Sequence, residues 1–175
     1  MQTINFRCRV ILIALGSNLS SRAGDCSQTL RAALDELARN DVVPQKVSAF
    51  YTTPAWPDPR DPSYVNAVAH VETILAPDAL MARLHAVERK FGRERGARNA
   101  PRTLDLDLLD YDGRIEGGPP VLPHPRIESR AFVLVPLADV APSWKHPVSG
   151  RNVRALIDAL PESERKIERL GQSGG

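Results

Sequence analysis

Two aspartates alternate with leucines in the segment Leu104-Asp105-Leu106-Asp107-Leu108. This alternation is typical of a β-strand, in which residues i and i+2 point to the same face, so we expect Asp105 and Asp107 to project together. Carboxylate oxygens are ligands that Mg²⁺ prefers, and bound Mg²⁺ completes its shell with water and substrate phosphates. The pair therefore predicts a site for one or two magnesium ions.

An arginine-rich segment comes just before this strand and contains Arg93, Arg95, Arg98 and Arg102. Guanidinium groups match the geometry of phosphate oxygens, so the combination indicates phosphoryl-type transfer from a nucleotide. A structural interpretation is also open, because an acidic strand can simply have a solvated face and a basic loop as its salt-bridge partner. The local spacing alone does not decide between the two.

The composition is that of an ordinary globular domain. With 175 residues and a net charge of +2, the chain has no global field that favours nucleic acid or a membrane surface. Cys8 and Cys26 show no metal-ligand spacing, and the apolar run from Val10 to Leu15 is too short for a signal core or a membrane span. We expect a cytoplasmic protein with one domain at residues 1–165 and a flexible tail at 166–175.

The periodicity of apolar residues predicts strands at 9–15, 42–51, 64–73 and 103–111, and helices at 27–37, 80–91 and 153–160. The first strand should end in a turn at 16–18, and residues 131–140 fit either a helix or a strand. The order strand, helix, strand, strand, helix, strand predicts an α+β fold. This would be a ferredoxin-like split βαβ sandwich, with an antiparallel or mixed sheet and helices packed on one face.

Five blocks of sequence, in this order and spacing, resemble the 6-hydroxymethyl-7,8-dihydropterin pyrophosphokinase family. The blocks are Ala14-Leu15-Gly16-Ser17-Asn18-Leu19, Phe50-Tyr51-Thr52-Thr53-Pro54, Tyr64-Val65-Asn66-Ala67, Pro101-Arg102-Thr103-Leu104-Asp105-Leu106-Asp107, and Pro123-His124-Pro125 with Arg130-Ala131-Phe132. The resemblance runs from about Val10 to Leu160. It implies a folate-pathway enzyme that transfers pyrophosphate from ATP to the hydroxymethyl oxygen of 6-hydroxymethyl-7,8-dihydropterin and releases AMP.

The resemblance also implies roles for particular residues. Asp105 and Asp107 would hold two Mg²⁺ ions that bridge the ATP phosphates, and Arg93 and Arg102 would close over the triphosphate as catalytic residues. The implied ATP-binding set is His85, Glu88, Arg93, Arg102, His124 and Arg130. The implied pterin-binding set is Thr53, Pro54, Trp56, Tyr64, Asn66 and Phe132.

Five of these residues also have a plainer interpretation. A flat heterocycle needs aromatic faces and an amide edge, which Tyr64, Phe132 and Asn66 could supply. Tyr64 and Phe132 could equally belong to the core, Asn66 could cap a strand end, and Trp56 could anchor a loop. His124 could cap local backbone in a turn between two prolines.

The chain departs from the commonest family pattern at two places. Asn99-Ala100 stands where Trp-Gly is usual, and Pro125 stands where an aromatic residue often follows the histidine. Neither departure changes a metal ligand or a loop arginine. We therefore expect activity to be retained, with loop closure and substrate affinity as the properties affected.

Two other functions also fit parts of the sequence. One is a nucleotide- or RNA-binding module whose basic loop engages phosphates while Tyr64 or Phe132 stacks on bases; the small net charge and the paired aspartates argue against it. The other is a catalytically silent pterin-binding relative, which the intact arginines and aspartates disfavour. We expect ATP and the pterin as small-molecule partners of a monomer, with neither nucleic acid nor membrane as a partner.

Overall fold

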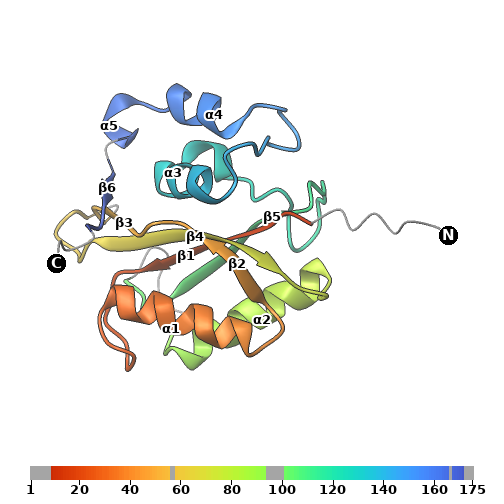
Figure 1. The fold of residues 1–175 in the computed structure, drawn as a ribbon. Coiled ribbons are helices and arrows are strands. Elements are labelled where there is room, and N and C mark those ends of the chain that lie inside the picture. The colour runs from red at the N-terminus through yellow and green to blue at the C-terminus, as the bar shows by residue number, and fades with distance from the viewer. Residues whose placement is uncertain (1–8, 56–57, 94–100, 166, 172–175) are drawn as a thin grey trace.

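The computed structural model describes residues 9–55, 58–93, 101–165 and 167–171. In this part of the chain, six strands form one sheet in which all hydrogen-bonded neighbours are antiparallel (Figure 1). The strands are β1 (Ile11–Ser17), β2 (Val43–Val47), β3 (Tyr51–Thr53), β4 (Tyr64–Glu72), β5 (Asp105–Tyr111) and β6 (Glu168–Arg169). The helices are α1 (Cys26–Ala38), α2 (Pro77–Lys90), the 3₁₀ turn η1 (Ile127–Ser129), α3 (Ala131–Val140), α4 (Val153–Ala159) and α5 (Glu162–Arg165).

The sheet has the strand order β5-β1-β4-β3-β6, and β2 also pairs with β4. Strand β1 therefore lies between β4 and β5. Strands β2 and β3 come after β1 in the chain, but in the sheet β4 separates them from β1. This is the split βαβ arrangement. The ferredoxin-like α+β sandwich predicted from the order of elements is confirmed.

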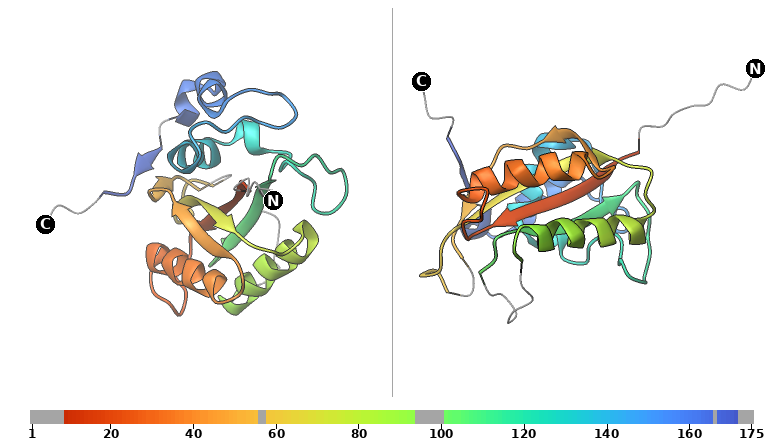
Figure 2. Two further views of the ribbon diagram at one scale, coloured as in Figure 1. Left: turned by 45° about the vertical axis from the view of Figure 1, so that its right-hand side comes forward. Right: turned by 90° about the horizontal axis from the view of Figure 1, so that it is seen from below.

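Helices cover both faces of the sheet, so the expectation that they pack on one face was wrong (Figures 1 and 2). Helices α1 and α2 lie side by side on one face and share a core with Ile11, Ile13 and Leu15 of β1. Helix α3 covers the other face, and α4 packs on α3. The second layer is required because β1 also turns Leu12 to that side, where it would otherwise expose apolar surface.

Helix α3 occupies the segment that the sequence left open as helix or strand. All of its residues except Asp139 are apolar, and its buried residues lie on more than one side of the helix: Ala131, Val133, Leu134, Pro136, Leu137 and Val140. A helix that is apolar around most of its circumference has no amphipathic stripe. It is therefore hard to distinguish from a buried strand by periodicity alone.

A capping box sets the start of helix α1. The Asp25 side chain accepts a hydrogen bond from the Gln28 backbone, and the Gln28 side chain accepts one from the Asp25 backbone, which makes a capping box. Helix α2 has Pro77 in its first turn, a position where proline costs no hydrogen bond. Both helices agree with the predicted ones to within a few residues.

The strand predicted at 42–51 is two strands, β2 and β3. Ser48 interrupts it, because its backbone N–H donates to Val68 O at 2.9 Å while its hydroxyl accepts from Val68 N at 3.0 Å. The predicted turn at residues 16–18 also begins late. Gly16 and Ser17 remain in β1 and pair with β4.

The last described residues return to the sheet. Strand β6 pairs with β3, and the N–H of Leu170 donates to Phe50 O at 2.8 Å. Glu168, Arg169 and Leu170 of the predicted tail therefore lie against the sheet edge. Among the described helices, none has the length and apolarity needed to cross a membrane.

Candidate active site

The two aspartates of β5 point to the face of the sheet that α3 covers. Asp105 pairs with Gly16 and Asp107 pairs with Ala14, while the intervening Leu106 belongs to the core on the opposite face. The predicted shared face is confirmed. The side chains of Asp105 and Asp107 are 28% and 36% exposed, so solvent and ligands can reach both carboxylates.

Three arginines surround the carboxylate pair. Arg93 lies 2.8 Å from Oδ1 of Asp105 and Arg102 lies 3.2 Å from its Oδ2, while Arg130 lies 3.8 Å from Oδ2 of Asp107. The salt-bridge partners considered in the structural interpretation are therefore present. The same contacts place three guanidinium groups, a type of group that can bind phosphate, beside the two carboxylates, as the functional interpretation requires.

Glu88 lies at the outer edge of β5. Its side chain is 4% exposed, and Oε1 accepts from the Leu106 backbone N–H at 2.7 Å and also from Arg93. Burial raises the pKa of Glu88 to about 7, although the hydrogen bond from Leu106 and the charge of Arg93 oppose the shift. Glu88 thus fixes the start of the acidic strand and holds Arg93 next to it. His85 lies one turn earlier on the same helix and is half-buried.

His124 reaches the site from the segment before η1. Its backbone N–H donates to Leu109 O at 2.8 Å, and its Nδ1 accepts from the Arg126 N–H at 3.1 Å. The turn-capping role is therefore present. Burial lowers the pKa of His124 despite the nearby charge of Asp107, which favours the neutral ring. With Nδ1 as the acceptor, the proton of that ring is on Nε2, which can donate to a ligand.

The donor set fits a hard cation. Burial and the charge of Asp105 raise the pKa of Asp107, so a cation placed between the two carboxylates would stabilise their charged forms. In the described part of the chain, no group of three or more His, Cys, Asp and Glu side chains is placed to hold a metal ion. A pair of carboxylates suits Mg²⁺, which takes its remaining oxygens from water and phosphates.

Three of the candidate pterin residues, Thr53, Tyr64 and Asn66, lie on the other side of β1. Asn66 and Tyr64 of β4 share a face with Thr53 of β3, and Nδ2 of Asn66 donates to Oγ1 of Thr53 at 2.9 Å. Burial raises the pKa of the half-buried Tyr64, and the adjacent Arg102 opposes the shift. Pro54 follows β3 and is exposed.

Phe132 is at the start of α3. It is 37% exposed, and the Arg130 guanidinium lies 5.5 Å from its ring centroid. It is therefore not a core residue. Trp56, Arg95, Arg98, Asn99 and Ala100, which the sequence analysis also singled out, lie outside the described residues.

Gly16 separates the two groups of candidate residues and was not predicted as part of the site. It pairs with Asp105 on one side and with Asn66 on the other. A methyl group at this position would lie 3.4 Å from Oδ1 of Asn66 and 3.9 Å from Cβ of Asp105. Glycine inside a strand often marks close approach of a ligand, which is the sequence signal that could have identified it.

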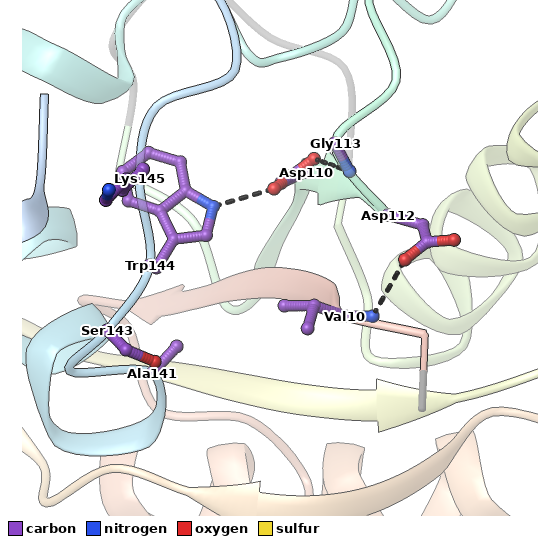
Figure 3. Close-up of a pocket in the computed structure, with 8 residues that line it drawn as sticks. All are labelled: Val10, Asp110, Asp112, Gly113, Ala141, Ser143, Trp144 and Lys145. Carbon is purple, nitrogen blue, oxygen red and sulfur yellow. Dashed lines mark hydrogen bonds between the residues drawn. The ribbon is translucent and has the colours of Figure 1, made fainter. Parts of the chain in front are cut away.

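A second group of polar residues lies at the far end of β5 and differs from the candidate site (Figure 3). These polar residues belong to the lining of a pocket, which consists of Val10, Asp110, Asp112, Gly113, Ala141, Ser143, Trp144 and Lys145. Asp110 is 2% exposed and accepts from the Trp144 indole at 2.7 Å and from the Gly113 N–H at 3.0 Å. Fixed protein donors already use both of its oxygens.

Comparison with known proteins identifies relatives of the whole domain. The family described as 7,8-dihydro-6-hydroxymethylpterin-pyrophosphokinase (HPPK) matches residues 12–142. The 2-amino-4-hydroxy-6-hydroxymethyldihydropteridine pyrophosphokinase of Pseudomonas aeruginosa is 39% identical over 165 residues, which cover 91% of this chain and 96% of the relative. The enzyme of the same name from Synechocystis is 38% identical over 156 residues, covering 88% and 77%.

Solved structures agree in fold. The wild-type HPPK-DHPS of Plasmodium falciparum superposes with a TM-score of 0.62 at 13% identity, over 85% of this chain. An HPPK-DHPS in complex with substrates gives a TM-score of 0.65 at 12% identity, over 86% of this chain. The present chain spans less than half of each of those proteins, 44% and 43% respectively.

Proposed function

The chain belongs to the 7,8-dihydro-6-hydroxymethylpterin-pyrophosphokinase family and transfers pyrophosphate from ATP to hydroxymethyldihydropterin in folate biosynthesis, and we propose that the residues on either side of Gly16 carry out this reaction. The observation that supports the assignment most directly is the separation of the two groups. Carboxylates and arginines gather around β5, and an amide and an aromatic ring lie on β4. One side suits a metal-bound triphosphate, and the other suits a pterin ring.

The ATP side contains the proposed catalytic residues. Mg²⁺ held by Asp105 and Asp107, with two ions proposed, would neutralise phosphate charge during the transfer. Three arginines lie beside Asp105 and Asp107: Arg93, Arg102 and Arg130. When ATP binds there, each guanidinium can leave its carboxylate partner and bind a phosphate oxygen, which is an equally good acceptor. They stabilise the charge that builds on the transferring group, while Nε2–H of His124 donates to ATP. His85 and Glu88 belong to the same side.

The pterin side orients the acceptor substrate. Oδ1 of Asn66 lies next to Gly16, 3.4 Å from where a methyl group would be, and we propose that it accepts from the edge of the ring. Tyr64 and Phe132 provide aromatic surface, and Thr53, Pro54 and Trp56 complete the proposed contacts. The hydroxymethyl oxygen then faces the β-phosphorus. Its attack forms a new O–P bond, breaks the bond from the β-phosphorus to the bridging oxygen that stays on the α-phosphate, and releases AMP and the proton of the hydroxyl group.

Three further features are proposals of a more general kind. We propose that the protein is a monomer. We propose the cytoplasm as the location, since the two cysteines indicate no disulfide framework. ATP and the reduced pterin are the proposed small-molecule partners.

The decisive experiment incubates the protein with ATP, Mg²⁺ and 6-hydroxymethyl-7,8-dihydropterin and separates the nucleotide products. AMP in equal amount to pterin pyrophosphate is the expected result. ADP as the product would instead indicate transfer of a single phosphoryl group. Absence of any pterin-dependent nucleotide product would contradict the proposed function.

A further inference from the structure

Asn18 follows β1 and is buried, with 2% of its surface exposed. Its side chain bonds to two segments that are distant in sequence. Oδ1 accepts from the Arg102 backbone N–H at 2.8 Å, and Nδ2 donates to Pro62 O at 3.1 Å. Its own backbone N–H donates to Arg102 O at 3.1 Å, which closes a two-bond ring with Arg102.

The two segments belong to different halves of the site. Arg102 ends the arginine segment and contacts Asp105, on the ATP side. Pro62 lies in the connection between Thr53 of β3 and Tyr64 of β4, on the pterin side. One amide group therefore joins the loop that faces ATP to the loop that faces the pterin.

The chemistry of this position is specific to asparagine. The contact needs an acceptor and a donor on one short side chain. Aspartate could keep the bond from Arg102 but has no hydrogen to give to Pro62. Leucine fills a similar volume and can make neither bond.

We propose that Asn18 is a positioning residue that couples the binding of the two substrates. The inference rests on the proposed function. The two hydrogen bonds of the Asn18 side chain fix the positions of Arg102 and Pro62 relative to each other, so a shift of Arg102 on binding of Mg²⁺-ATP also moves the backbone at Pro62 toward the arrangement that binds the pterin. Thermodynamic linkage makes the effect reciprocal, and the pterin tightens ATP by the same factor.

Calorimetry measures this coupling directly. The Kd of the oxidised ligand 6-hydroxymethylpterin is determined with and without a nonhydrolysable ATP analogue and Mg²⁺, and the ratio of the two values is the coupling factor. We expect a factor of about 5 to 150 in the wild-type protein, the usual range for linked sites. In Asn18→Leu the factor should fall to near one.

Two further variants separate coupling from general damage. Asn40→Leu is the matched control, because Asn40 is also a bonded amide, to Glu36 and Arg83, at a distance from the site. It should keep the wild-type coupling factor. Asn18→Asp should keep affinity for the ATP analogue alone within about threefold while losing the coupling.

A wild-type coupling factor of one, an unchanged factor in Asn18→Leu, or an equal loss in Asn40→Leu would each overturn the proposal. If circular dichroism shows that Asn18→Leu does not fold, the Asn18→Asp variant decides the question by the same measurement. Failure of the proposed function is distinguishable, since it would appear in the wild-type protein as absent pterin binding and absent AMP formation.

Discussion

The two ends of β5 use the same residue type in opposite ways. At its start, Asp105 and Asp107 are part-exposed and have arginine partners between 2.8 and 3.8 Å away. At its other end, Asp110 is buried against the Trp144 indole and the Gly113 backbone. Long cationic side chains can move from a carboxylate to a phosphate, whereas an indole locked in the core and a backbone N–H cannot.

A perturbed pKa does not separate the two ends. Burial raises the pKa of Asp107 and also that of Asp110. A buried carboxylate with fixed neutral donors is a structural group. The comparison teaches that exchangeable partners, together with access for a ligand, distinguish the functional carboxylates from the structural one.

The largest expected effect is at the start of the strand. Asp105→Asn or Asp107→Asn should lower turnover by about three orders of magnitude or more, because several kcal/mol of charge stabilisation by bound metal would be lost. Asp107→Asn should keep the free energy of unfolding, since the environment already favours the neutral form. AMP formation at saturating Mg²⁺ measures the first effect and denaturant titration the second. Wild-type turnover in both variants would remove the two aspartates from the reaction.

The arginine partners come next in size. Arg102→Ala should lower turnover by about ten- to a thousandfold and change pterin affinity much less, because its proposed contact is with phosphate in the transition state. Arg93→Ala should behave similarly. Arg154→Ala is the matched control, since that side chain is 81% exposed and pairs with Asp158 away from the site. Lost pterin affinity with preserved turnover would place Arg102 on the other half of the site.

The far end of the strand should respond in stability rather than in rate. Asp110→Ala leaves the Trp144 indole and the Gly113 N–H without their acceptor and should lower the free energy of unfolding by about 1 to 3 kcal/mol. The folded fraction should turn over at the wild-type rate. Trp144→Phe removes only the indole donor and tests the same contact from the other side. A large loss of turnover at normal stability would make Asp110 a functional residue and break the comparison.

Glu88 should affect stability in a way that depends on pH. Its pKa is raised from 4.5 to about 7, so between these values the folded state binds more protons than the unfolded state. Stability from this group is therefore present at acidic pH and is lost as the pH rises through about 7. From pH 5 to 8 the loss should be about 2 to 3 kcal/mol. Unfolding followed in chelator-containing buffer should show this slope in the wild type and a flatter profile in Glu88→Gln. Equal slopes would assign the pH dependence to another group.

Much of the fold follows from local patterns. The alternation around Asp105 and Asp107 predicted their shared face, and the helical spacing of apolar residues predicted α1 and α2. The second helical layer was missed because α3 is apolar around most of its surface, so its residues lack the period that distinguishes a helix from a strand. The division of β2 from β3 depends on a contact between Ser48 and Val68, which local sequence does not contain.

The sequence identified some residues of the site but not others. Residues with distinctive chemistry, such as the aspartates and Arg102, stood out by type. Gly16 and Asn18 did not, because their roles come from what three strands and two loops place around them. The role of Gly16 depends on the absence of a side chain between Asp105 and Asn66. The role of Asn18 depends on two backbone partners that are 84 and 44 residues away in the chain.

The pairing of Gly16 with both neighbouring strands also sets a length. Asp105, Gly16 and Asn66 form one row across β5, β1 and β4. With adjacent strands about 4.8 Å apart, the backbones of Asp105 and Asn66 are about 10 Å apart. The backbone hydrogen bonds between the three strands maintain this distance. Substitutions around the site can therefore change the affinity for each substrate. The distance between the two bound substrates stays the same as long as β5, β1 and β4 remain paired.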